Sequence, residues 1–294
     1  MQSAERISGM TSSPMTAKVA YDTSVQSVFE LLNRNLADYN PISLIARGFG
    51  PEQIIDTGIE REKIRAIGFD TNALFRIASN KKSAAIIDGL EASRLPLVVP
   101  GQVLQEFWNN KVTGLPTLSG TVASGLDKIE KELESMTDTF GLGEALSEVT
   151  TALNKFTKTH KGLVSSSLTA SLRSLFEMLD ARSTIAYVPR QEFAVLGQAR
   201  FSTKTPPGFK DSNSLGDFFV WADFLLGLCT AGLDQMPSGT TDGKDIVIFV
   251  TEDRKVDWEV RGYVHPVLEG EVERLTGSAL QLWTVSELLS FLEA

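Results

Sequence analysis

The stretch Ile64–Phe75, IRAIGFDTNALF, constrains the fold of this chain more than any other part. Its first half is a short apolar run without helical spacing, preceded by the charged residues REK, and this pattern is typical of a buried strand. Asp70 ends the run, and Thr71 or Asn72 supplies a side-chain oxygen that can cap a following helix. Ligand sites of open α/β sheets collect at the carboxyl ends of strands, which is where this pattern places Asp70. Taken singly, Asp70 is explained equally well as a turn residue that supports a helix N-terminus.

Further apolar runs extend the pattern along the chain. Leu97–Val99, Ile246–Val250 and Leu280–Trp283 each predict a strand, and segments with helical spacing lie between them. The run IVIFV is apolar throughout, as in a parallel sheet that is buried on both faces. A helix over FFVWADFLLGLC is apolar on nearly every side, which predicts that it is buried. The fold class is therefore α/β, with a central parallel sheet.

Composition divides the chain into four parts. Residues 1–18 are rich in Ser, Thr and Met and are predicted to be disordered, whereas residues 19–63 carry helical spacing and form a helical N-terminal extension. Residues 64–294 hold the α/β domain. Within that domain, residues 114–181 place leucines at helical intervals among polar residues, which predicts an insertion of two or three helices packed on the edge of the α/β body.

Charge and residue counts exclude several classes of protein. The formal net charge of −9 argues against a surface that attracts nucleic acid everywhere, so any such binding must be local. One cysteine and two histidines, none of them at ligand spacing, disfavour disulfides and zinc. No apolar run has the length of a membrane span, and the N-terminus lacks the apolar segment of a secretory signal. We therefore expect a cytoplasmic protein without a membrane partner.

Four acidic residues are expected to gather at one edge of the sheet. Asp70 and Asp253 both end predicted strands, and parallel strands put both residues on the same edge. Glu106 and Asp217 lie on helices near sheet connections and can lean over that edge. Clustered carboxylates repel one another, and a divalent ion normally relieves the repulsion. Oxygen ligands select Mg²⁺ or Mn²⁺, and such ions can orient a water, lower its pKa and stabilise the charge that develops on a phosphodiester during hydrolysis.

Four motifs carry a resemblance to a known family. DTNALF, PGQVLQEFW, KDSNSLGDFFVW and IFVTEDRKVDW resemble the successive signatures of PIN domains, and most closely the PIN-like group whose fourth motif reads Thr, acid, Asp, then Lys and Asp-Trp. The resemblance implies a three-layer α/β/α fold and a Mg²⁺- or Mn²⁺-dependent nuclease, usually acting on RNA. It also assigns residues: Asp70, Glu106, Asp217 and Asp253 as the catalytic, metal-holding acids, Asp211 as a fifth acid, and Asn72 and Thr251 as the residues that orient the carboxylates.

The favoured function is a metal-dependent endoribonuclease that acts on single-stranded RNA. Five basic residues are the expected phosphate contacts: Arg200, Lys204, Lys210, Arg254 and Lys255. A second copy of the chain or a protein partner is expected to bind through the insertion. One alternative is a PIN-like binding module with little or no cleavage, which a metal titration would distinguish. Another is an aspartyl-phosphate phosphatase with Asp70 as nucleophile, but that class expects a second Asp where Asn72 stands.

Overall fold

The structure is a computed structural model of the 294-residue chain. It describes residues 14–33, 42–51, 55, 57–112, 128–129, 131–133, 143–210, 214–235 and 245–294. Of the predicted tail, residues 1–18, the first 13 lie outside this set. The remaining residues of the tail form the start of helix α1 (Pro14–Asn33). Asp211, the fifth acid of the resemblance, also lies outside the described residues.

A parallel sheet of five strands forms the centre of the molecule. Its spatial order is β3-β2-β1-β4-β7, so β1 and β4 are neighbours although the chain passes through two other strands between them. The bounds are β1 Ile64–Phe69, β2 Leu97–Pro100, β3 Ser183–Ala186, β4 Ile246–Val250 and β7 Ala279–Trp283. In β1 and β4 all but one residue of each strand is buried, which explains their continuous apolar runs. The predicted α/β class is confirmed.

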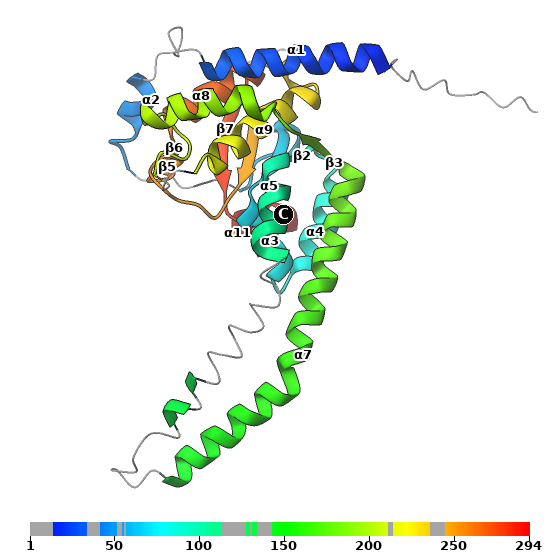
Figure 1. The fold of residues 1–294 in the computed structure, drawn as a ribbon, viewed down its shortest axis with the longest axis vertical. Coiled ribbons are helices and arrows are strands. Elements are labelled where there is room, and N and C mark those ends of the chain that lie inside the picture. Colours follow the sequence, from blue (N-terminus) through cyan, green and yellow to red (C-terminus); the bar gives the residue numbers. More distant parts are fainter. Residues whose placement is uncertain are drawn as a thin grey trace, which may run out of the picture.

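Helices cover both faces of the sheet, which makes the fold three-layered (Figure 1). One layer contains α3 (Thr71–Ser79), α4 (Ser83–Ser93), α11 (Val285–Glu293) and the C-terminal part of α7 (Gly143–Arg182). The other contains α9 (Gly216–Thr230) and α10 (Pro266–Thr276), with α1 and α8 (Arg190–Ser202) packed outside α9. Shorter elements complete the fold: α2 Ile42–Arg47, η1 Arg61–Lys63, α5 Gly101–Glu106, the π-helix η2 Phe107–Val112, η3 Leu233–Gln235, and an antiparallel pair of strands, β5 Glu259–Val260 and β6 Tyr263–Val264.

Helix α9 packs closely against the middle of the sheet. Eleven of its residues are buried, as its continuous apolar sequence predicts. A Cβ atom added to Gly68 of β1 would lie 2.3 Å from the Phe224 ring, and one added to Gly227 would lie 2.3 Å from Val98 of β2. Glycine is therefore required at both contacts between α9 and the strands. This packing fixes the start of α9, which carries Asp217, relative to the ends of the strands.

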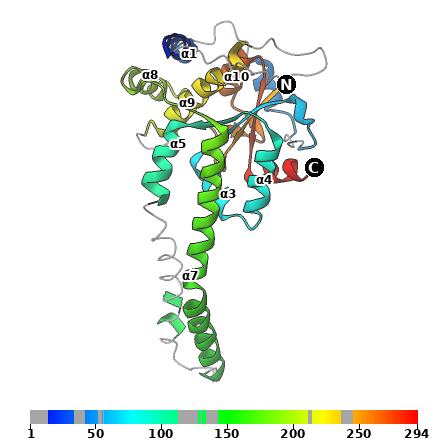
Figure 2. The same cartoon turned by 90° about the vertical axis from the view of Figure 1, so that its right-hand side faces the viewer.

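The predicted insertion differs from expectation in its second half. Residues 143–182 form one continuous helix, α7, rather than parts of several helices, and it extends far beyond the α/β body (Figures 1 and 2). Its last four turns belong to the core, because Leu172, Leu175 and Leu179 are buried and Phe176 packs edge-on against Phe107 at 4.8 Å. The insertion therefore does not simply lie on an edge of the body: its C-terminal end completes the helical layer beside α3 and α4.

Two local features were not predicted from the sequence. Strand β3 is an edge strand that none of the apolar runs predicts, and Ile185 in it is 42% exposed. At Phe107 the α-helix α5 gives way to the π-helix η2, and Trp108 in η2 is 65% exposed. Among the residues that the structure describes, no helix combines the length and the hydropathy needed to cross a bilayer.

Candidate active site

Asp70 stands at the junction of β1 and α3, at the carboxyl edge of the sheet. Its backbone is extended and its N–H donates to the carbonyl of Val250, the last residue of β4, at 2.9 Å. The Oδ1 atom accepts a hydrogen bond from the Thr71 N–H at 2.6 Å, so Asp70 itself caps α3 and neither Thr71 nor Asn72 is the cap. The Oδ2 atom accepts from the hydroxyl of Thr251 at 3.2 Å. The turn aspartate and the candidate site residue are thus the same side chain.

Thr251 joins two of the predicted acids. It follows β4 directly, is 1% exposed, and its N–H donates to the carbonyl of Trp283 in β7. Its hydroxyl donates to Asp70 and also accepts a hydrogen bond from the Asp253 N–H at 3.0 Å. The parallel pairing of β1 with β4 therefore brings Asp70 and Asp253 to one edge, as the sequence predicts.

Glu106, at the end of α5, is held by two side chains. Its Oε2 accepts a hydrogen bond from the Thr71 hydroxyl at 3.0 Å, and its Oε1 accepts from Nε2 of Gln102 at 3.0 Å. A Cβ atom added to Gly216 would lie 2.7 Å from Oε1, so the absence of a side chain there lets Glu106 lie against the start of α9. Thr71 thus connects the Glu106 carboxylate to the turn that carries Asp70.

Asp217, in the first turn of α9, is oriented by the segment after β4. Its Oδ2 accepts a hydrogen bond from Nε1 of Trp258 at 3.3 Å and lies 3.7 Å from Nζ of Lys255. Trp258 is buried and its ring is parallel to that of Phe249, with the centroids 5.6 Å apart. The Asp-Trp pair of the fourth motif therefore has a structural role: the tryptophan reaches across to the third acid.

Lys255 also contacts Asp253. Its backbone N–H donates to Oδ1 of Asp253 at 3.0 Å, and its ammonium group lies 2.8 Å from Oδ2 of the same carboxylate. Hydrogen bonds through Thr71 and Thr251, together with the ion pairs of Lys255, therefore join Asp70, Glu106, Asp217 and Asp253 in one continuous polar network.

The electrostatics of Asp70 reflect this crowding. Burial is the main cause that raises the pKa of its carboxyl group to about 6, and the charges of Glu106 and Asp253 raise it further. The hydrogen bonds from Thr71 and Thr251 oppose the increase because they stabilise the ionised form. A carboxyl group with this pKa favours a nearby positive charge near neutral pH, and perturbed groups of this kind concentrate at functional sites.

The donor set of this site fits a hard divalent cation. All four acids offer oxygen atoms, and the mutual repulsion at Asp70 is what a cation would relieve. Within the described parts of the chain, however, no three carboxylate, imidazole or thiol groups lie close enough to hold an ion as the side chains now stand. The hydroxyls of Thr71 and Thr251 and the ammonium of Lys255 occupy the space between the acids. Binding one ion by all four acids requires the side chains to turn toward one another.

Arg200 is buried, which corrects its prediction as a phosphate contact. It is 6% exposed, pairs with Glu271 at 2.6 Å and donates to the carbonyls of Leu32 and Pro206. Glu271 in turn accepts a hydrogen bond from Nε1 of Trp221 at 2.7 Å. Arg200 therefore joins α1, α8 and α10 inside the molecule and is not placed to meet a substrate.

The other predicted phosphate contacts and the two predicted orienting residues differ in their surroundings. Lys204 and Lys210 are exposed, as a phosphate contact requires, whereas Arg254 is paired with Glu259 and Glu287. Thr251 forms hydrogen bonds with the Asp70 carboxylate and the Asp253 N–H. Asn72 is exposed, and the residue that holds Glu106 is its neighbour Thr71.

Asp223 and Asp257 are two buried acids whose roles the sequence did not indicate. Asp223 of α9 forms a bidentate pair with Arg190 at 2.8 and 3.0 Å and accepts hydrogen bonds from the backbone of Gln102 and Val188. Asp257 accepts a hydrogen bond from the Gly208 N–H at 2.9 Å. An aspartate inside an otherwise apolar helix is the signal that could have identified Asp223, because such a charge requires buried partners.

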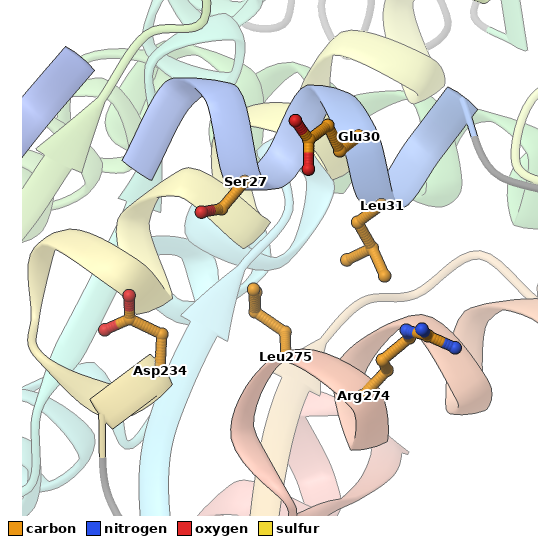
Figure 3. Close-up of a pocket in the computed structure, with 6 residues that line it drawn as sticks. All are labelled: Ser27, Glu30, Leu31, Asp234, Arg274 and Leu275. Atoms are coloured by element: carbon orange, nitrogen blue, oxygen red, sulfur yellow. The ribbon is translucent and has the colours of Figure 1, made fainter. Parts of the chain in front are cut away.

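The cavity of Figure 3 lies elsewhere in the molecule. It has a volume of about 250 Å³ and lies between α1, η3 and the end of α10. Its wall includes Asp234, which follows the C-terminal end of α9, whereas Asp217 is at the N-terminal end. The cavity is therefore separated from the acidic network by the length of α9.

A parallel sheet of five strands with flanking helices and an acidic network at its carboxyl edge defines a three-layer α/β protein with a candidate site at the strand ends. Residues 141–265 match the sequence profile of the family described as "PIN like domain", which supports a PIN-like domain in this chain. The match includes Asp217 and Asp253, whereas Asp70 and Glu106 precede it. The chain matches no curated protein and no solved structure.

Proposed function

We propose that this protein is a Mg²⁺- or Mn²⁺-dependent nuclease that hydrolyses phosphodiester bonds, and that its substrate is single-stranded RNA cut at internal positions. One observation carries the proposal: at the carboxyl edge of the sheet, Thr71 connects Asp70 to Glu106 through its backbone N–H and its hydroxyl, and the Thr251 hydroxyl connects Asp70 to Asp253. The PIN-like domain supports it, because domains of this family are generally nucleases.

Each residue has a distinct role in this proposal. Asp70, Glu106, Asp217 and Asp253 hold the divalent ion, which supplies positive charge and lowers the pKa of a water. Thr71 and Thr251 fix the orientation of the carboxylates, and Trp258 fixes that of Asp217. Lys204 and Lys210 are exposed and remain proposed phosphate contacts, and exposed Trp108, two residues after Glu106, offers a ring for an unpaired base.

The test is a cleavage assay with the purified full chain. Labelled single-stranded RNA and DNA of the same sequence are incubated with Mg²⁺, Mn²⁺ or EDTA, and products are resolved by length. We expect internal cleavage of RNA that EDTA abolishes. Asp70→Asn should remove it, whereas Asp88→Asn, an exposed aspartate on α4, should not. Cleavage that persists in EDTA or in Asp70→Asn would disprove the assignment.

A binding module of the same fold is a second candidate, and one observation favours it. Among the described residues the acids do not stand at ion-binding distance, and Lys255 lies between two of them. This candidate predicts saturable binding of RNA without cleavage at any Mn²⁺ concentration. The projecting helix α7 would then be the surface for a second copy or a protein partner. The phosphatase alternative is less favoured, because both carboxylate oxygens of Asp70 accept hydrogen bonds and Asn72 takes the place of the second Asp.

A further inference from the structure

Lys255 is placed where a cation of the acidic site belongs. Its ammonium group lies 2.8 Å from Oδ2 of Asp253 and 3.7 Å from Oδ2 of Asp217, so it contacts carboxylates of two different elements. These are two of the four carboxylates that the proposed function assigns to a divalent ion. In the metal-free protein, the positive charge of the lysine therefore offsets part of the repulsion among the carboxylates. A bound ion would offset the same repulsion.

The backbone around Lys255 determines this placement. Its carbonyl accepts hydrogen bonds from the N–H groups of Trp258 and Glu259 at 2.9 and 3.0 Å, and its own N–H donates to Asp253. The side chain is 39% exposed at its position between the acids. An anchored backbone and a half-exposed side chain let the ammonium leave the carboxylates for solvent without movement of the chain, and without a large cost in hydration.

The neighbouring cation is not placed for such an exchange. Arg254 is paired with Glu259 and Glu287, neither of which is one of the four acids. Lys255 is therefore the charge that a bound ion would free beside the site.

We propose that Lys255 is a tethered counter-cation that competes with the divalent ion for Asp217 and Asp253 and, once displaced, contacts the phosphodiester of the substrate. This inference rests on the proposed function and adds an order to it: metal binding comes first and creates a positive group for the nucleic acid. A charged side chain that competes with one ligand and assists the other has opposite effects on their two affinities. A purely structural lysine does not.

The experiment measures both affinities on the full chain. Mn²⁺ binding is followed by calorimetry, and binding of a fluorescein-labelled RNA oligonucleotide by anisotropy in Ca²⁺, with gels to check that the oligonucleotide stays intact. Lys255→Met is expected to bind Mn²⁺ roughly threefold more tightly, the scale of a half-exposed ion pair, and the oligonucleotide correspondingly more weakly. Lys255→Arg keeps the charge and should resemble the wild type in both assays.

The matched control is Lys81→Met, which changes the net charge equally but lies beyond the C-terminal end of α3, away from Asp70. It should leave both affinities unchanged. Equal Mn²⁺ affinity in Lys255→Met and the wild type, or unchanged oligonucleotide binding, would overturn the role of Lys255 alone. Absence of saturable Mn²⁺ binding in both proteins would overturn the proposed function as well. Binding that appears only in Lys255→Met would support the competition in its strongest form.

Discussion

Two threonine side chains determine how the acidic residues face one another. Thr71 is the first residue of α3 and Thr251 the first after β4, and both are buried. A hydroxyl group can donate one hydrogen bond and accept others, so a single hydroxyl can connect two groups. Two carboxylates without such a group between them repel each other. Residues that hydrogen-bond to metal-binding carboxylates hold these carboxylates in place. The loss of such a residue typically reduces metal affinity or activity by about 10–100-fold.

Replacement of Thr71 by Val tests this role. The Val side chain has nearly the same shape but donates nothing to Glu106, so we expect cleavage to fall by about tenfold or more. Thr71→Ser retains the hydroxyl and should keep most of the activity. Rates measured under saturating Mg²⁺, together with melting temperatures, separate this effect from unfolding. Equal rates in Thr71→Val and the wild type would show that the hydroxyl does not position Glu106.

The raised pKa of Asp70 predicts how stability depends on pH without metal. Because the folded-state pKa, about 6, exceeds the ordinary value of 3.8, the stabilising contribution of the protonated carboxyl is complete below pH 4 and is lost as the pH rises through 6. In EDTA, Asp70→Asn should therefore be more stable than the wild type at pH 8, by roughly 1–3 kcal/mol, with the difference shrinking toward pH 4. Denaturant titrations at both pH values measure this. A simple capping aspartate predicts the opposite sign at pH 8.

At the scale of elements, Asp223 connects three parts of the fold. From the middle of α9 it reaches the N-terminal turn of α5 through Gln102, the segment between β3 and α8 through Val188, and α8 through Arg190. Burial raises the pKa of this carboxyl group, and the hydrogen bonds from Arg190 and the two backbone groups oppose the increase. The Gln102 side chain also holds Glu106, so Asp223 supports the site from a distance.

Asp223→Asn is therefore expected to destabilise the fold, although Asp223 is not a motif acid. The substitution leaves Arg190 without its buried partner, and we expect a loss of about 2 kcal/mol or more in unfolding free energy. Chemical denaturation measures the loss, with exposed Asp88→Asn as the control. Residual cleavage per folded molecule should fall less than in Asp217→Asn. A neutral Asp223→Asn would mean that Arg190 and the backbone groups find other partners.

Strands surrounded by core on both faces were the easiest elements to predict. The bounds of β1 and β4 agree with the apolar runs Ile64–Phe69 and Ile246–Val250, because all but one position of each strand is buried. Strand β3 was missed, because only one of the four residues of this edge strand is buried. The buried roles of Arg200 and Asp223 depend on partners far away in the sequence, Glu271 and Arg190, and single-sequence patterns do not encode such pairs.

At the scale of the whole molecule, helix α7 has two parts: a C-terminal part that packs on the body and a part that projects from it. Its last turns are buried beside α3 and α4, whereas the turns from Gly143 onward extend away from the body (Figure 2). The body and the projection are therefore expected to respond differently to deletion.

Replacement of residues 114–164 by a flexible linker of about eight Gly and Ser residues tests this separation. Because Phe107 and Phe176 are in contact, the two ends of the deletion start from neighbouring positions on the body. We expect cooperative unfolding, a metal response and a cleavage rate close to those of the full chain. A longer deletion, to residue 176, removes buried Leu172 and Leu175 and should prevent folding. Loss of activity in the shorter deletion alone would show that the projection takes part in substrate binding.

The adjacency of β1 and β4 has a consequence for biosynthesis. Asp70 is translated early, but its neighbour in the sheet and the last acid, Asp253, are translated more than 170 residues later. A nascent chain on the ribosome therefore carries an incomplete site until Asp253 has emerged. For a proposed ribonuclease made next to messenger and ribosomal RNA, this strand order delays activity until β4 can pair with β1.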